Sequence, residues 1–255
     1  MNTENNNFKI GITERGDAGL DFSWRETFKH TDKRAILITK RISDEFIEAV
    51  MEEVNNGANL IIHATVTGLG GTPIEPNVPT PEFSLSQIVK LIEAGFPVDR
   101  IILRLDPIIP GYEDFSEVVL IRALKLGILQ NAHCKVSVLD MYKHSRERFE
   151  KAGIKIDMPY FKASHKQFET INQMLNKYIK YGVKFTSCNE PDLTVATPAG
   201  CVDKSVCDIM GIDVLNTGVN PQGRGNCLCL CGCKTELLNN KKRCSHGCLY
   251  CYWKD

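Results

Sequence analysis

The end of the chain carries the pattern with the clearest chemistry. Cys244, Cys248 and Cys251 follow a C-x3-C-x2-C spacing, and the aromatic Tyr250 precedes the last of them. Three closely spaced thiolates can bind three irons of a four-iron–four-sulfur cluster and leave the fourth iron without a protein ligand. That iron can chelate the amino and carboxylate groups of S-adenosylmethionine (SAM) and pass an electron to its sulfonium. The products would be methionine and a 5′-deoxyadenosyl radical, which can take hydrogen from an unactivated carbon.

Further cysteines precede this triad. The chain has 11 cysteines, and all except Cys134 lie between Cys188 and Cys251. An odd number of thiols without a secretory leader argues against a disulfide framework and favours metal binding. The candidate ligands of a second, auxiliary iron–sulfur cluster are the upstream thiols Cys188, Cys201, Cys227, Cys229, Cys231 and Cys233. Cys207 lies among them, and spacing alone does not decide which thiols share a site.

Zinc is the main alternative for these cysteines. It prefers four ligands, commonly arranged as two cysteine pairs. Cys248 and Cys251 supply one such pair, and the upstream C-x-C run supplies another. The chain would then be a non-catalytic zinc or iron–sulfur protein that serves in binding or electron transfer. His246, between two of the cysteines, is expected to be a turn residue rather than a ligand.

The first 187 residues alternate short apolar runs with amphipathic segments. The apolar runs predict strands at Phe8–Thr13, Ala35–Thr39, Leu60–Val66, Ile101–Leu105, Val136–Leu139 and Val183–Thr186. The amphipathic segments predict helices at Asp44–Val54, Ser84–Ala94, Phe115–Leu126, His144–Ala152 and Ser164–Tyr181. Runs without polar alternation are typical of parallel strands that are covered on both faces. Strands alternating with helices therefore predict an α/β fold of βα units.

Six strands predict a partial (β/α)6 barrel over residues 1–187, because a closed eight-stranded barrel needs a longer chain. Residues 188–255 form a second, cysteine-rich segment in which the periodicity stops. With little apolar surface, this segment is expected to fold through metal–thiolate bonds. Because chemistry in such barrels lies at the C-terminal ends of the strands, we expect the segment to close over that pocket.

The terminal stretch Arg243–Tyr252 resembles the cluster loop of radical SAM enzymes, in particular the spore photoproduct lyase-like group. Four further segments match motifs of that group: Ile36–Lys40, Ala64–Thr67, Ile74–Pro76 and Arg104–Gly111. The chain resembles still more closely an uncharacterised radical-SAM-like family with C-terminal cysteines. That second match includes Ser137–Tyr142, Cys188–Glu190 and Cys201–Asp203. The family typically has a single C-x-C, whereas this chain has four alternating cysteines.

The resemblance implies roles for individual residues. Lys40 and Arg104 would bind the SAM carboxylate, although a surface ion pair is the plain alternative for each. Thr65 and Thr67 would offer hydroxyls to the ribose or amino group of SAM, and Tyr250 would lie beside the adenine. The cofactors would be a SAM-binding 4Fe–4S cluster, SAM and an auxiliary cluster. The expected partner is a reductant such as a flavodoxin or ferredoxin.

The resemblance also implies a circular permutation, because most radical SAM enzymes carry the cysteine loop after their first strand. Here the loop follows the last one. Val183–Thr186 would then occupy the usual position of the first strand, and Phe8–Thr13 that of the second. Permutation is tolerated where chain termini lie close together at the surface.

Charge and hydropathy say less about partners. Residues 1–130 carry 13 Lys and Arg against 19 Asp and Glu, and residues 131–255 carry 18 against 12. A basic half suits an anion, but solvated helix faces account for it equally well. Similarity to a DNA-lesion repair enzyme suggests a nucleobase or nucleic-acid substrate, which the neutral net charge does not favour. No apolar run reaches the ~18 residues of a membrane span, so we expect a cytoplasmic protein.

Overall fold

The computed structural model describes residues 10–129, 133–212, 228–229, 234–240 and 243–254. Within these residues, an eight-stranded sheet forms the centre of the molecule, and all its paired strands run parallel. In sheet order the strands are β7 (Thr197–Pro198), β6 (Lys184–Ser187), β5 (His133–Val138), β4 (Ile101–Ile108), β3 (Asn59–Thr65), β2 (Arg34–Thr39), β1 (Ile10–Ile12) and β8 (Lys234–Glu236). Since β7 and β8 end this order, the described sheet is open.

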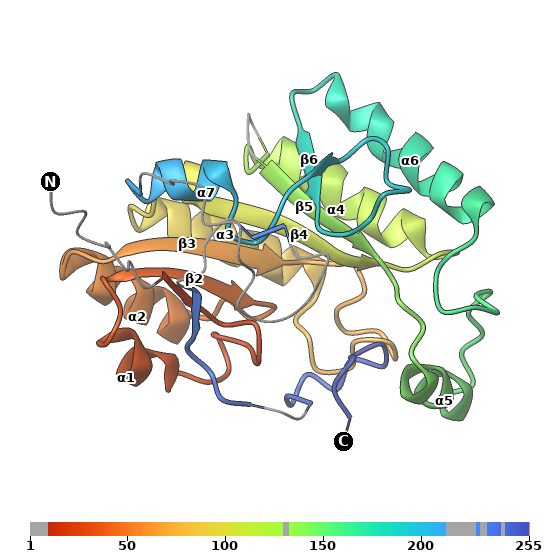
Figure 1. Cartoon of the computed structure of the whole chain (residues 1–255), viewed down its shortest axis with the longest axis horizontal. Coiled ribbons are helices and arrows are strands. Elements are labelled where there is room, and N and C mark those ends of the chain that lie inside the picture. The colour runs from red at the N-terminus through yellow and green to blue at the C-terminus, as the bar shows by residue number, and fades with distance from the viewer. Residues whose placement is uncertain (1–9, 130–132, 213–227, 230–233, 241–242, 255) are drawn as a thin grey trace, which may run out of the picture.

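Helices connect most of these strands (Figure 1). The helices of the described chain are α1 (Trp24–Phe28), α2 (Asp44–Asn55), α3 (Pro81–Glu93), α4 (Glu113–Lys125), α5 (Lys143–Lys151), α6 (His165–Ile179) and α7 (Lys204–Ile209), with a 3-10 turn at Val98–Arg100. Ser43 and Thr80 cap α2 and α3 by accepting hydrogen bonds from backbone N–H groups, and Ser164 forms a capping box with Gln167 at α6. Such caps satisfy donors that the first helical turn leaves open.

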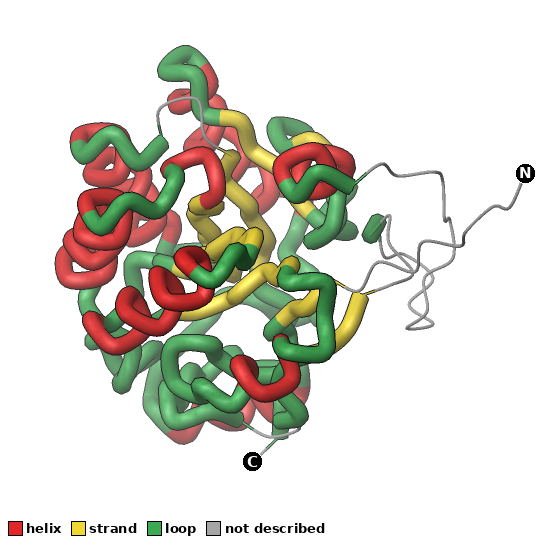
Figure 2. Tube along the Cα trace, turned by 90° about the vertical axis from the view of Figure 1, so that its left-hand side faces the viewer, coloured by secondary structure: helices red, strands yellow, loops and turns green. Residues whose placement is uncertain are grey.

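The two faces of the sheet have separate apolar cores. On one face, Leu37, Leu60 and Leu103 pack with side chains of the long helices, such as Phe46 of α2. On the other face, Ile36 and Ile61 pack with Val206 and Met210 at α7. Successive side chains of a strand point to opposite faces, so one strand feeds both cores. Figure 1 shows α7 and α2 on opposite sides of β2 and β3, and Figure 2 shows helices gathered along one side of the strands.

The face covered by α7, called the inner face from here on, changes character along the strands. It is apolar near their amino ends, at Ile61 and Ile102. Two residues farther along, β3 carries His63 and β4 carries Arg104 on this face. Lys135 of β5 lies opposite Arg104 in the strand register. The carboxyl half of the inner face is therefore polar and charged.

The α/β class predicted from the sequence is confirmed, and the six predicted strands correspond to β1–β6. We expected Val183–Thr186 to occupy the usual first-strand position, next to Phe8–Thr13, and this expectation is wrong. That run is β6, which pairs with β5 and β7, whereas the neighbour of β1 is β8. We did not predict β8 because it is only Lys-Thr-Glu and has no apolar run. The two leucines that follow anchor it, as Leu237 contacts Gly11 and Leu238 is fully buried.

The described parts of residues 188–255 belong to the sheet and its cover. They contribute both of its outer strands, β7 and β8, together with α7. No helix of the described chain has the length and apolar character needed to cross a membrane.

Candidate functional site

Two successive turns shape the segment Arg243–Tyr252, here called the cysteine loop. The N–H of Gly247 donates to the carbonyl of Cys244 at 3.3 Å, and the N–H of Cys251 donates to that of Cys248 at 3.2 Å. Gly247 has φ +66°, a left-handed conformation that favours glycine. Each turn therefore has a cysteine at its start, and the second also has one at its end.

The cysteine loop is docked against the segment that follows β3. The N–H of Leu249 donates to the carbonyl of Ile74 at 3.0 Å, in the manner of a short strand contact. The side-chain amide of Asn77 donates to the carbonyl of Ser245 at 2.8 Å, and its backbone N–H donates to that of His246 at 3.3 Å. These bonds bring the end of the chain to the carboxyl edge of the sheet, where the pocket was predicted.

His246 joins the loop to the segment after β1. Its Nε2 lies 2.9 Å from Oδ2 of Asp17, and its Nδ1 lies 3.3 Å from the carbonyl of Asn77. Asp17 also accepts hydrogen bonds from the Thr39 hydroxyl and the Lys40 N–H. Burial acts to raise the pKa of Asp17, but these bonds and His246 lower it below its usual value. Both ring nitrogens thus have protein partners, which supports a structural role for His246.

Glu75 is the centre of a second polar network at this edge. It is fully buried and accepts from Lys40 Nζ at 2.9 Å, from Thr67 Oγ1 at 2.6 Å and from the Tyr250 hydroxyl. Lys40 Nζ also lies 5.4 Å from the centre of the Tyr250 ring, within cation–π range. Burial acts to raise the pKa of Glu75, but the Lys40 charge and the two hydroxyls lower it. The structure thus brings three predicted site residues together around a carboxylate that we did not predict.

Two thiols of the loop, Cys244 and Cys248, are electrostatic neighbours of Lys40 in this network, and Cys251 is a neighbour of Cys244. Burial raises the pKa of Cys248 to about 12, with Glu75 and Cys244 adding to the rise and Lys40 opposing it. Burial also raises the pKa of Cys244, with Cys251 contributing and Lys40 again opposing. Such thiols lose their protons when a metal replaces them, so metal binding and thiol ionisation are coupled. The chemistry of the loop therefore fits a cationic group bound at its three sulfurs.

No three His, Cys, Asp or Glu side chains of the described chain come close enough together to hold a single metal ion. A four-iron–four-sulfur cluster differs from a single ion, since each cysteine binds a different iron.

Arg104 and Thr65 stand side by side on the inner face, in register between β4 and β3. Arg104 pairs with Asp106, which also accepts from the Ser137 hydroxyl. Burial acts to raise the pKa of Asp106, whereas Arg104, Ser137 and Lys40 lower it. Asp106 is thus an electrostatic neighbour of both predicted SAM-binding cations, Lys40 and Arg104.

A second group of thiols lies over the inner face. Cys201 and Cys229 are hydrogen-bonded to each other, and this bond and burial raise the pKa of Cys201 well above its usual value. Cys188 is a further electrostatic neighbour of Cys201. Gly200 permits the close approach, because a Cβ there would lie 2.5 Å from the backbone nitrogen of Cys229. These three thiols are called the inner thiols from here on.

The remaining upstream cysteines divide into two kinds. Cys227, Cys231 and Cys233 were predicted as auxiliary-cluster ligands and lie outside the described residues. Cys207 belongs to α7 and points into the apolar core between that helix and the sheet, where burial raises its pKa to about 11. Three cations surround the inner thiols: Lys135, Arg104 and Lys234, whose Nζ is 4.0 Å from the sulfur of Cys229.

His63 is the most unusual buried group nearby. It is fully buried, and within the described structure neither ring nitrogen has a hydrogen-bond partner. Burial, with the charges of Arg104 and Lys135, lowers its pKa well below the usual value. A buried polar group without a partner is costly, so among the described residues His63 is a source of instability on the inner face.

Sequence reasoning missed Glu75, Asp106 and His63 as site residues. Glu75 and Asp106 stand inside segments that carried the family resemblance, Ile74–Pro76 and Arg104–Gly111. That was the available signal for them. His63 gave no signal, because it stands within a strand that otherwise reads as apolar.

One family model covers nearly all of this architecture. It is described as a domain of unknown function, DUF1848, and matches residues 24–253. The chain belongs to DUF1848. The match includes Lys40, Glu75, Arg104 and the three terminal cysteines, so the site lies within the DUF1848 unit, whereas Asp17 precedes it. No curated protein and no solved structure matched the chain.

Proposed function

We propose that this DUF1848 protein is a radical SAM enzyme. The observation that carries the proposal is the position of Cys248, which is buried on a loop at the carboxyl edge of a parallel sheet and interacts with Lys40 at the end of β2. When bound, a four-iron–four-sulfur cluster with one open iron supplies the electron and the chelation site for cleaving SAM to methionine and a 5′-deoxyadenosyl radical. The radical then takes hydrogen from a substrate.

The protein's part begins with the ligands Cys244, Cys248 and Cys251. Burial keeps the Cys244 and Cys248 thiols protonated until a cation binds, and Lys40 favours the thiolate form of Cys248. Hydrogen bonds from Asn77 and Leu249 hold the loop backbone against the segment that follows β3.

The charges beside the loop suit the methionine end of SAM, which carries an ammonium and a carboxylate. Lys40 and Arg104 offer cations, and Glu75 and Asp106 offer carboxylates in alternation with them. Arginine matches a planar carboxylate through two parallel N–H bonds. Thr65 lies beside Arg104, and Tyr250 presents a ring at the rim for the adenine. Thr67 supports the site through Glu75.

Strand order supports the proposed circular permutation in a changed form. β8 precedes the cysteine loop and pairs with β1 in parallel, so β8 takes the place that we had expected for Val183–Thr186. The loop then follows an outer strand, and β1 is the next strand of the sheet.

The inner thiols support an auxiliary iron–sulfur cluster. Cys188, Cys201 and Cys229 come from separate segments of the chain, yet their thiols interact on the inner face. The cations Lys135 and Lys234 nearby would offset the negative charge of thiolates. Metal analysis tests this: anaerobically reconstituted protein should bind more than about four irons per chain. Replacing the three inner thiols by alanine should lower that number while 5′-deoxyadenosine is still formed. An unchanged iron content would contradict this part of the proposal.

The decisive experiment for the main proposal is product analysis. Anaerobically reconstituted, dithionite-reduced protein should convert SAM to 5′-deoxyadenosine, and the triple variant C244A/C248A/C251A should form none. Cys207→Ala is the matched control, because Cys207 is buried away from the loop, and it should retain the reaction. Product formation by the triple variant would overturn the assignment. Zinc binding without 5′-deoxyadenosine in the wild type would favour a structural metal site.

A further inference from the structure

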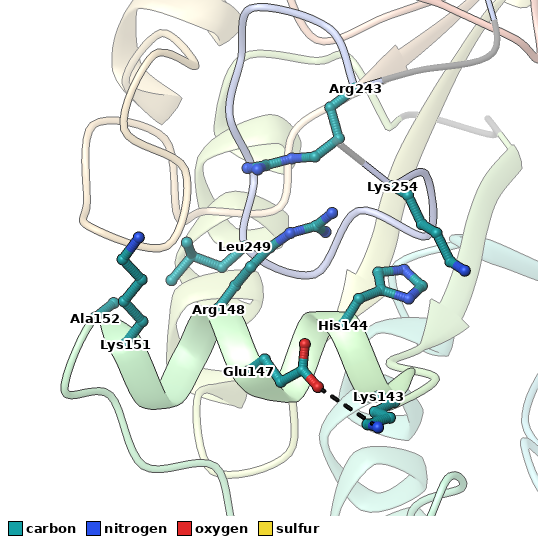
Figure 3. Close-up of a pocket in the computed structure, with 9 residues that line it drawn as sticks. All are labelled: Lys143, His144, Glu147, Arg148, Lys151, Ala152, Arg243, Leu249 and Lys254. Atoms are coloured by element: carbon teal, nitrogen blue, oxygen red, sulfur yellow. Dashed lines mark ion pairs between the residues drawn. The ribbon is translucent and has the colours of Figure 1, made fainter.

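A basic groove of about 820 Å³ lies between α5 and the end of the chain. Figure 3 shows side chains of α5 on one side and Arg243 and Lys254 on the other. The described residues that line it include five cations and one carboxylate: Lys143, Arg148, Lys151, Arg243, Lys254 and Glu147. Glu147 lies 3.9 Å from Lys143 and offsets part of that charge. The groove therefore has a strongly positive balance.

Two arginines that line this groove are hydrogen-bonded to the backbone of the end of the chain. Arg148 donates to the carbonyl of Cys251 at 2.6 Å and to that of Trp253 at 2.7 Å. Arg243 donates to the carbonyl of Gly247 at 2.6 Å and to that of Cys248 at 3.2 Å. A molecule in the groove would thus contact Arg148 and Arg243. These side chains are hydrogen-bonded to the backbone carbonyls of two candidate cluster ligands, Cys251 and Cys248.

The opposite side of the loop is occupied differently. There Cys248 interacts with Lys40 and Glu75, at the carboxyl edge of the sheet. A substrate of the radical must reach that side, since the proposed SAM site lies there. The groove behind the loop is separate from it, so its occupant need not meet SAM.

We propose that this groove docks an acidic one-electron donor protein, of the kind represented by a flavodoxin. The inference rests on the proposed function. The donor loses one electron and the cluster held by the loop gains one, with no transfer of atoms. Complementary charge speeds such encounters and makes them sensitive to salt. Lys151 and Lys254 are exposed and supply charge at the two sides of the groove.

The test uses full-length, reconstituted protein and purified reduced flavodoxin. Bleaching of the iron–sulfur absorbance is followed by anaerobic stopped flow at low salt. The variant K151E/K254E should be reduced at least about tenfold more slowly than wild type, with a weaker salt dependence. The control K125E/K180E has the same change in net charge. Lys125 ends α4 as Lys151 ends α5, and both control positions are exposed ahead of the amino ends of β5 and β6. The control should react within about twofold of wild type.

Reduced methyl viologen, a small cation, separates docking from damage to the cluster. It should reduce K151E/K254E at least as fast as wild type. Slow reduction by both donors would mean a damaged loop and would overturn the inference, as would equal slowing in the control. Unchanged flavodoxin reduction together with lost binding of a fluorescent single-stranded oligonucleotide would assign the groove to nucleic acid instead. A wild type that binds a cluster but forms no 5′-deoxyadenosine with dithionite overturns the proposed function, whereas slowed flavodoxin reduction still supports the docking surface.

Discussion

The two faces of the sheet are built from the same strands but have opposite character at their carboxyl halves. One face is covered by the long helices α2, α3, α4 and α6 and is called the helix-covered face from here on. Its buried side chains, such as Leu37, Leu60 and Leu103, are apolar along the strands. On the inner face, the apolar stretch ends at Ile61 and Ile102, and His63 and Arg104 follow. One face therefore serves the core alone, whereas the other changes from core to charged site.

This difference separates stability from function. Taking a charge out of water costs several kcal/mol unless a good partner offsets it, and apolar replacements are often as stable. Lys40, Glu75 and Arg104 are buried or nearly so. On the helix-covered face, Leu103 shows that the same strand as Arg104 also accepts buried apolar side chains. The proposed SAM site gives these buried charges a role, and each prediction below compares a residue at or beside that site with one elsewhere.

The largest effect is expected at Glu75. Glu75→Ala leaves Lys40 buried without its carboxylate and removes the partner of Thr67, so it should lower the free energy of unfolding by about 3–5 kcal/mol. Glu82→Ala removes a carboxylate from an exposed pair with Arg122 and should cost less than about 1 kcal/mol. Chemical denaturation of the apo proteins measures both. Equal, small losses would mean that the Glu75 network does not stabilise the fold.

SAM affinity is the next effect in size. Arg104→Ala removes one charge-assisted hydrogen-bond donor and should weaken SAM binding roughly ten- to hundredfold, or about 1.5–3 kcal/mol, while the cluster absorbance persists. Lys40→Ala should weaken it less, because an ammonium lacks the bidentate fork. Arg122→Ala, on the helix-covered side, should leave the affinity unchanged. Equilibrium binding to reconstituted protein decides, and unchanged affinity in both inner-face variants would put SAM elsewhere.

The buried ring of His63 should lower the stability of the apo protein. His63→Leu removes two unpaired buried nitrogens and should raise the free energy of unfolding of the apo protein by about 1–3 kcal/mol. His165→Leu, at an exposed position on α6, should change it by less than about 0.5 kcal/mol. Thermal denaturation compares them. A destabilised H63L protein would show that the ring already makes favourable interactions within the fold.

The smallest effect concerns acid stability. The pKa values of Asp106 and Glu117 both lie below their usual values, through Arg104 and Ser137 in one case and through Lys177 and Tyr178 in the other. A lowered folded pKa contributes stability at neutral pH that is lost as pH falls through that pKa. Asp106→Asn should therefore cost about 1–2 kcal/mol at pH 7 and progressively less below about pH 3.8.

Glu117→Gln, on α4, should lower the free energy of unfolding by less than about 1 kcal/mol at neutral pH. This difference should vanish below about pH 4.5. Urea denaturation of each variant and the wild type at several pH values measures both differences. If the Asp106 difference grew as pH fell, the carboxyl would be stabilised in its protonated form and the ion pair with Arg104 would be excluded.

The parts of the fold that could be predicted from sequence are those whose signal is local. β1–β6 follow from apolar runs, and α2–α6 follow from the period of their amphipathic segments. The missed elements are α1, α7, β7 and β8, and each has six residues or fewer. Their positions depend on strands and cores supplied by distant parts of the chain, so no local pattern could reveal them.

The same division applies to the site. Spacing identified the three terminal cysteines, and resemblance identified Lys40, Thr67 and Tyr250. Only folding brought the last three to one carboxylate, Glu75, because its partners come from the ends of β2 and β3 and from the last turn of the chain.

The sequence by itself determined the alternation of strands and helices and the set of thiols, since side-chain period and residue type act over a few neighbouring residues. The tertiary structure decided which charges face inward, which cysteines meet and that β8 stands beside β1. Those outcomes depend on register and on contacts between residues far apart in the chain, such as Asp17 and His246. Their free energy arises only when the whole sheet has formed.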